Sequence, residues 1–184
     1  MPNRKIITAV TTMIVTMGAL LFGAAPAHAE YFTYISVLAP SGVSKKVLDI
    51  RDKSTQERGI AQIWDLLPTS SLTRNQRWAA RQTANGSGVY EIVNELSGMC
   101  LDKSQDTPNA NGNKVYQAVC RHTPNQQWRL IHTVDYSNST WEWAELQNLD
   151  GGRCLDVPGA EFVAGKALVV WDCNGNRNQR WNIF

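Results

Sequence analysis

The sequence predicts an all-β fold assembled from three copies of one unit. The pattern Asn-Gln-x-Trp occurs three times and ends at Trp78, Trp128 and Trp181, which are 50 and 53 residues apart. Short runs of strand-like alternation are separated by clusters of Gly, Asn, Asp and Pro, and no convincing amphipathic helix is present. The clearest of these runs are Tyr90–Val93, Ala144–Gln147 and Ala167–Trp171.

The first 29 residues have the three regions of a secretory signal peptide. Arg4 and Lys5 precede an apolar stretch from Ile6 to about Ala25, and the small residues Ala27 and Ala29 mark a cleavage site. The alternative is a transmembrane anchor, but threonines dilute the apolar stretch. We therefore expect a secreted chain of residues 30–184 with no membrane span.

The exported chain is long enough for one domain and carries no net charge. The sequence has 18 Lys and Arg against 16 Asp and Glu, so loss of Arg4 and Lys5 leaves 16 of each. This balance does not favour nucleic acid as a partner. His122 and His132 lack the ligand spacing of a zinc site, and no motif calls for a metal or another cofactor.

Four cysteines in an exported chain indicate two disulfides rather than metal or redox chemistry. The second and third copies each carry Cys-Leu-Asp near the start and a further Cys before Asn-Gln-x-Trp. The repeat therefore predicts the bridges Cys100–Cys120 and Cys154–Cys173, each within its own copy.

The first copy follows the same pattern without cysteines. Val47-Leu48-Asp49 stands in place of Cys-Leu-Asp, and Trp64-Asp65-Leu66 in place of Trp171-Asp172-Cys173. We expect Val47 and Leu66 to replace the bridge with a buried contact. The copies span about residues 31–80, 88–130 and 142–184, and each is too small to bury its own apolar face. They are thus expected to close around one shared core.

Cys-Leu-Asp, Gly, Trp-Asp-Cys and Gln-x-Trp, repeated three times, resemble the ricin B-type lectin family, which is also grouped as a carbohydrate-binding module. The resemblance covers nearly all of residues 30–184. It implies a β-trefoil, in which twelve strands form three four-stranded lobes. It also implies that Trp78, Trp128 and Trp181 are core residues near the pseudo-threefold axis.

The resemblance further implies a sugar pocket in each copy. A carboxylate and a carboxamide bond adjacent hydroxyls, and an aromatic ring covers the apolar face of a pyranose. The first copy supplies Asp49, Gln62, Trp64 and Asn75, with Gln76 supporting Asp49. The third copy supplies Asp156, Val169, Trp171 and Asn178, with Gln179 in support. The second copy supplies Asp102, Tyr116 and Asn125, but Ala118 replaces the aromatic residue and weakens the site.

Two interpretations of these residues compete. Asp and Asn often stabilise turns, and Trp64 and Trp171 could belong to the core. However, the middle copy loses only this aromatic residue, and a core Trp replaced by Ala would cost about 3 to 5 kcal/mol. We therefore favour binding, and we expect Asp49 and Asp156 to be exposed pocket residues whose loss leaves folding intact.

The pattern favours a binding protein over an enzyme. A glycosidase needs two carboxylates at a fixed separation, whereas the recurrent Asp residues belong to different copies. A protease-inhibitor trefoil would not need the repeated set. An adhesion or interaction subunit of a toxin or secreted enzyme complex stays open, with Lys53–Arg58 and Tyr31–Leu38 as places for a protein partner. We expect a monomer that binds galactose-type glycans or xylan-like polysaccharide.

Overall fold

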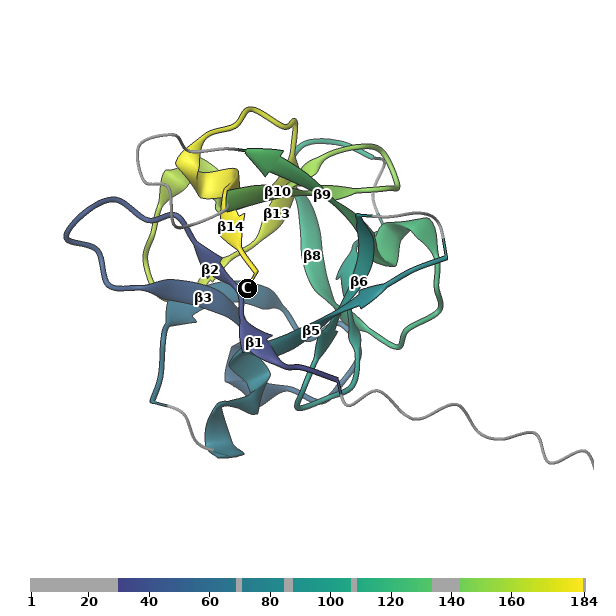
Figure 1. Ribbon diagram of the computed structural model, residues 1–184, viewed down its shortest axis with the longest axis horizontal. Helices are drawn as coiled ribbons and strands as arrows, with labels where there is room; N and C mark the ends of the chain where they lie inside the picture. The colour runs from purple at the N-terminus through teal and green to yellow at the C-terminus, as the bar shows by residue number, and fades with distance from the viewer. Residues whose placement is uncertain (1–29, 69–70, 85–87, 107–108, 134–142, 184) are drawn as a thin grey trace, which may run out of the picture.

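The chain forms three lobes around a common axis, and each lobe contains one copy of the repeat. The structure is a computed structural model that describes residues 30–68, 71–84, 88–106, 109–133 and 143–183. The last strand, β14, runs to the centre of the view in Figure 1. The predicted signal peptide, residues 1–29, lies outside the described residues.

Each lobe has four strand positions. The first lobe contains β1 (Thr33–Tyr34), β2 (Ser36–Val37), β3 (Lys46–Ile50), β4 (Ala61–Asp65) and β5 (Arg77–Gln82). The second contains β6 (Val89–Asn94), β7 (Cys100–Lys103), β8 (Asn113–Ala118) and β9 (Gln127–Thr133). The third contains β10 (Trp143–Asn148), β11 (Cys154–Asp156), β12 (Lys166–Ala167), β13 (Val169–Trp171) and β14 (Trp181–Asn182). One position is interrupted at Ile35 and another at Leu168, so twelve positions appear as fourteen strands.

The first and fourth positions of the lobes form a closed barrel. Around the ring, β5 pairs with β6, β6 with β9, β9 with β10, β10 with β14, and β14 with β2. The ring closes because β1, which continues into β2, pairs with β5. A closed ring leaves no unpaired sheet edge, which is how a protein of short strands avoids edge-to-edge association.

The second and third positions form three hairpins that cover one end of the barrel. The hairpins are β3 with β4, β7 with β8, and β11 with β13. They are joined to one another because β12 pairs with β4, β13 pairs with β8, and Ile60 forms a bridge with Tyr116. A barrel with a hairpin triplet is the β-trefoil, so the predicted fold is confirmed.

The core contains the tryptophan of each Asn-Gln-x-Trp motif. Trp78, Trp128 and Trp181 are fully buried, as predicted, among aliphatic side chains of all three lobes. Each indole N–H donates at 3.0 Å to the carbonyl of the leucine in its own lobe that precedes the recurrent Asp. The pairs are Trp78 to Leu48, Trp128 to Leu101 and Trp181 to Leu155. These bonds satisfy the polar end of each buried ring.

Both predicted disulfides are present, but the expectation for the first lobe is wrong in part. Cys100–Cys120 and Cys154–Cys173 each have a Cα–Cα distance of 5.1 Å. Val47 is buried, as expected, whereas Leu66 is 37% exposed. Leu66 follows the third strand directly, at a position where the chain leaves the sheet for the surface, so no buried contact replaces the bridge.

The helical segments of the described chain are short 3-10 helices of three to six residues, which were not predicted from the sequence. They are η1 (Arg51–Lys53), η2 (Ser71–Gln76), η3 (Pro124–Gln126), η4 (Pro158–Ala160) and η5 (Arg177–Gln179). Three of them, η2, η3 and η5, carry the Asn-Gln pair that precedes each core tryptophan. Among the described residues, no helix has the length and apolarity needed to cross a membrane.

Candidate functional site

The carboxylate that recurs in each lobe is buried. Asp49, Asp102 and Asp156 lie on β3, β7 and β11, and their exposed fractions are 3%, 4% and 3%. The expectation that Asp49 and Asp156 are exposed is therefore wrong. The side chains are covered because the 3-10 turn before the core tryptophan lies directly against the second strand of each lobe.

The Asn-Gln pair of that turn binds the carboxylate in all three lobes. Both side-chain amides donate to the same oxygen, Oδ2. The asparagine bonds are 2.8 Å for Asn75 to Asp49, 3.0 Å for Asn125 to Asp102 and 2.8 Å for Asn178 to Asp156. The glutamine bonds are 3.1 Å for Gln76, 2.8 Å for Gln126 and 2.7 Å for Gln179. Gln126 was not among the predicted site residues, although its motif matches that of the other two.

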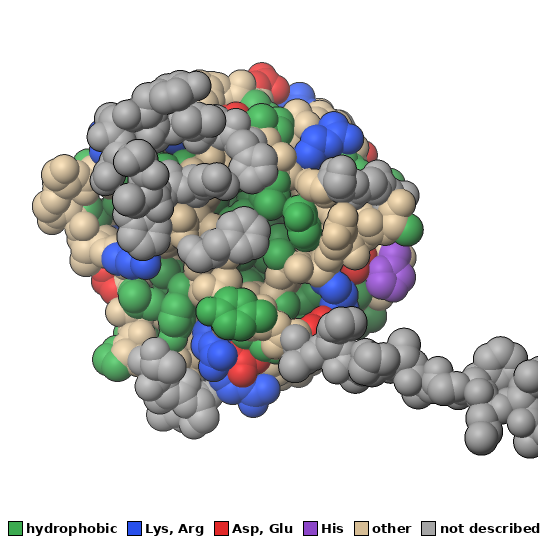
Figure 2. Space-filling view, in the orientation of Figure 1, with side chains coloured by type: hydrophobic (Ala, Val, Ile, Leu, Met, Phe, Trp, Pro, Cys, Tyr) green, Lys and Arg blue, Asp and Glu red, His purple; other side chains and the backbone are tan. Residues whose placement is uncertain are grey.

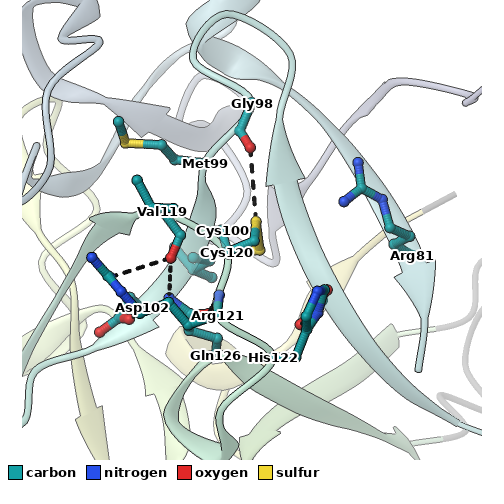
Figure 3. Close-up of a disulfide and its surroundings, with 12 residues drawn as sticks. Arg81, Gly98, Met99, Cys100, Asp102, Val119, Cys120, Arg121, His122 and Gln126 are labelled. Atoms are coloured by element: carbon teal, nitrogen blue, oxygen red, sulfur yellow. Dashed lines mark hydrogen bonds and ion pairs between the residues drawn. A yellow bond between two sulfur atoms is a disulfide. The ribbon is translucent and has the colours of Figure 1, made fainter. Parts of the chain in front are cut away.

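In each lobe, the glutamine also links the carboxylate to the loop that follows the third strand position. Gln126 Nε2 donates to the carbonyl of Val119 at 2.9 Å, and its Oε1 accepts from the backbone N–H of Arg121 at 2.7 Å. Figure 3 shows this glutamine between Asp102 and Val119, close to the Cys100–Cys120 bridge. Gln76 and Gln179 make the equivalent pairs of bonds. The carboxylates thus hold local structure, as the turn-stabilising interpretation proposed, and Asp49 and Asp102 also line surface pockets.

Burial raises the pKa of the three carboxyls. The loss of hydration disfavours the charged form, and the amide hydrogen bonds offset this only in part. The pKa of Asp49 is raised to about 6, with burial as the largest cause and the bonds from Gln62, Gln76 and Asn75 opposing it. The pKa values of Asp102 and Asp156 are raised for the same reason.

The raised pKa of Asp49 makes part of the stability depend on pH. The folded state takes up the proton near pH 6 and the unfolded state near the ordinary value of 3.8. Stability therefore rises as pH falls through this window. Between pH 7 and pH 4.5, we expect wild type to gain about 2 kcal/mol relative to Asp49→Asn, measured by urea unfolding of both proteins at both pH values. A difference that does not change with pH would contradict the shift.

In the first lobe, four of the five predicted residues, Asp49, Gln62, Trp64 and Asn75, line one surface pocket of about 210 Å³. Gln62, which is buried, donates to Asp49 Oδ1 at 2.8 Å and accepts from Arg51 Nε at 2.8 Å. Trp64 is 39% exposed at the edge of the pocket. The pocket therefore combines a fixed carboxylate and carboxamides with an exposed indole, which are the groups that a pyranose requires. Arg51 was not predicted as a site residue, because it lies in η1 after the end of β3, and the sequence does not show that this turn places it beside Gln62 of β4.

In the third lobe, the carboxylate of Asp156 and the indole of Trp171 recur, but Val169 stands where the first lobe has Gln62. Trp171 is 42% exposed, so neither it nor Trp64 is a core residue. Asn178 and Gln179 both bond Oδ2 of Asp156, and among the described residues no side chain donates to its Oδ1. Val169 lines a different cavity, in the middle of the hairpin end.

The second lobe has lost the exposed aromatic platform. Ala118 is buried, and the guanidinium of Arg58 from the first lobe lies 4.9 Å from the centre of the Tyr116 ring. Glu57 and Arg121 form an ion pair of 2.7 Å at the same pocket, which has a volume of about 230 Å³. Tyr116 thus has a cation over its ring face, and the weaker sugar binding of this lobe stays a prediction.

The described residues contain no group of three or more His, Cys, Asp or Glu side chains that could hold a metal ion. On the face of the molecule seen in Figure 2, apolar side chains gather toward the middle, and charged side chains lie mostly around them. The candidate chemistry is therefore that of hydrogen-bonding amides and carboxylates beside exposed indole rings.

A family model described as ricin-type beta-trefoil lectin domain-like matches residues 41–118, 74–143 and 124–184. The chain belongs to this family. Its three matches cover the three lobes, which confirms the resemblance inferred from the motifs. Membership of a lectin-like family supports carbohydrate binding by this chain.

Known proteins show the same fold in several contexts. Serine protease 1 of Rarobacter faecitabidus is 29% identical over 109 residues, which are 59% of this chain and 19% of the protease. The chain spans about half the length, or less, of these curated relatives. The designed threefold-symmetric protein ThreeFoil has a TM-score of 0.68 and 28% identity, over 82% of this chain and 96% of its own. The C-half of the earthworm R-type lectin, solved with GalNAc, has a TM-score of 0.58 and 20% identity, over 82% and 95%.

Proposed function

We propose that the protein is a secreted lectin that binds sugar through the pockets of the first and third lobes. One observation carries the proposal. The first and third lobes each place an exposed tryptophan, Trp64 or Trp171, in the same lobe as a carboxylate that an Asn-Gln pair holds. The second lobe keeps the carboxylate and the amides but lacks the exposed ring. Two disulfides support export, because such bridges persist in oxidising compartments.

The proposed ligand is a galactose-type glycan or a xylan-like polysaccharide. The earthworm lectin with this fold was solved with GalNAc, which favours the first class. Shallow pockets bind single sugars weakly, and two pockets on one rigid body gain affinity on a polymer or a clustered glycan. A monomer with two pockets is sufficient for this gain.

We propose no catalytic role for the carboxylates. Each of the three aspartates takes its side-chain hydrogen bonds from its own lobe, and none bonds another. A hydrolase would need two cooperating carboxyls at one bond. Incubation with a bound polysaccharide is therefore expected to release no reducing sugar.

The proposal is tested by a glycan array and by pull-down with insoluble polysaccharides. The variant Trp64→Ala with Trp171→Ala is expected to lose binding by at least about tenfold, because each indole supplies the apolar contact of one pocket. Tyr31→Ala, which removes another exposed aromatic ring, serves as the control and should bind like wild type. Equal binding by the double variant would place the sugar on another surface.

A second candidate is a targeting subunit or module that uses the same pockets on behalf of a protein partner. It is favoured by the protease relative, of which this chain matches only 19%. The test is co-purification of the exported protein from its native medium. A stoichiometric partner would support the subunit, and the free protein alone would support an independent lectin.

A further inference from the structure

A cavity of about 650 Å³ opens in the middle of the hairpin end, apart from the three carboxylates. It is roughly three times as large as the pocket beside Asp49, for which the volume is about 210 Å³. Neither the three aspartates nor Trp64 and Trp171 line it. Its size falls in the range of small-molecule sites in proteins, which is about 300 to 1,000 Å³. We refer to it as the axial cavity.

The axial cavity lies where the three lobes meet. Ile60, Lys114 and Ala167 occupy equivalent positions of the first, second and third lobes, and all three line it. The pairing of β4 with β12, the pairing of β8 with β13, and the bridge between Ile60 and Tyr116 connect the hairpins around it. The walls are therefore β-strands tied to one another, so the cavity is preformed.

The lining joins an apolar wall to a set of cations. Ile60, Leu168 and Val169 supply apolar surface, and Arg51, Arg58, Lys114 and Lys166 supply positive charge. Among the described residues, no Asp or Glu lines the cavity. Outside it, Asp106 pairs with Arg58 and Glu161 pairs with Lys166. Four cations against two carboxylates leave a formal excess of two positive charges at the cavity. By contrast, residues 30–184 as a whole carry 16 charges of each sign.

Two of these cations form no salt bridge in the described part of the chain. Arg51 donates to Gln62 Oε1 at 2.8 Å and to the carbonyl of Gly165 at 2.9 Å. The side chain of Lys114 is exposed, and its charge acts on Asp106, which already pairs with Arg58. Ammonium and guanidinium groups only donate hydrogen bonds. A ligand of this cavity must therefore supply the acceptors.

The backbone at Arg58 is held in a conformation that favours glycine. Its φ is 65°, and the equivalent residues of the other lobes are Gly112, at 83°, and Gly165, at 87°. A side chain is disfavoured in this region, because its Cβ comes close to the following carbonyl oxygen. In this conformation, Arg58 pairs with Asp106 and lies over the ring of Tyr116. An arginine kept where glycine fits better is consistent with a role for its charge at the cavity.

We propose that the axial cavity binds a small organic anion with an apolar body, of the class of acyl or aryl carboxylates and sulfonates. The apolar wall takes the body of the ligand, and Arg51, Lys114 and Lys166 supply the positive charge for the anionic group. The site is independent of the sugar pockets and does not rest on the proposed lectin function.

The test is a fluorescence titration with the anionic dye 8-anilinonaphthalene-1-sulfonate. We expect one dye per protein, weaker binding in added sodium chloride, and displacement by decanoate but not by decanol. Lys114→Gln with Lys166→Gln should weaken binding of the dye by about tenfold. Lys45→Gln with Arg129→Gln removes two exposed cations elsewhere and should leave it unchanged.

Three results would overturn the proposal. Unchanged affinity in Lys114→Gln with Lys166→Gln would place the dye elsewhere. Equal displacement by decanol and decanoate would show an apolar surface without selection for charge. Displacement by heparin but not by decanoate would indicate a surface for polyanions instead of a cavity for a small anion. Polysaccharide binding should be the same in both double variants, so the outcome here is separate from that of the lectin proposal.

Discussion

Removing both disulfides is expected to lower the free energy of unfolding by about 6 kcal/mol. The bridges join residues 20 and 19 positions apart. In the chain-entropy account, loops of this length stabilise the folded state by about 3 kcal/mol each. Because domains of this size have a total stability of about 5 to 15 kcal/mol, the variant with four alanines should be marginal or unfolded. The effect is measured by urea unfolding of wild type, of the two variants in which one cysteine pair is replaced by alanine, and of the variant with four alanines.

The first lobe provides the reciprocal test. Val47 faces Trp64 across the hairpin in the same register in which Cys100 faces Ala118 and Cys154 faces Trp171. Val47→Cys with Leu66→Cys should therefore form a third bridge and add up to about 3 kcal/mol. If this bridge forms without added stability, or if the paired-alanine variants unfold like wild type, the loop-closure explanation is wrong for this protein.

Features that repeat within each copy could be predicted from the sequence. The β-trefoil, the two bridges and the burial of Trp78, Trp128 and Trp181 all follow from motifs that recur at matched positions. The exposure of Trp64 and Trp171 followed from a comparison of copies, because the second copy has Ala118 at their position and keeps its core tryptophan. A repeat supplies three examples of one environment, so differences between copies separate core positions from surface positions.

Contacts between lobes could not be predicted, because one sequence does not show how its copies are set against one another. Arg58 of the first lobe lies over Tyr116 of the second, and Arg51 reaches the backbone of Gly165 in the third. The burial of Asp49 and its partners was also missed. A polar residue suggests exposure, and only the Asn-Gln turn that covers the carboxylate reverses this expectation.

Replacing Trp181 with alanine is expected to lower the free energy of unfolding by about 3 to 5 kcal/mol. The ring is fully buried in the shared core, and its N–H bonds the carbonyl of Leu155 at 3.0 Å. The substitution therefore creates a cavity and leaves that carbonyl without its partner. Urea unfolding followed by far-UV circular dichroism gives the loss, which should be similar in Trp128→Ala because Trp128 makes the equivalent bond to Leu101.

Trp64→Ala is the matched control, because it removes the same side chain from a position that is 39% exposed. The expected loss of stability is below about 1 kcal/mol, since a partly exposed ring leaves no enclosed cavity. Its expected effect is on sugar binding instead. A loss of stability in Trp64→Ala comparable to that in Trp181→Ala would make Trp64 part of the structural core and would remove the main support for a sugar pocket in the first lobe.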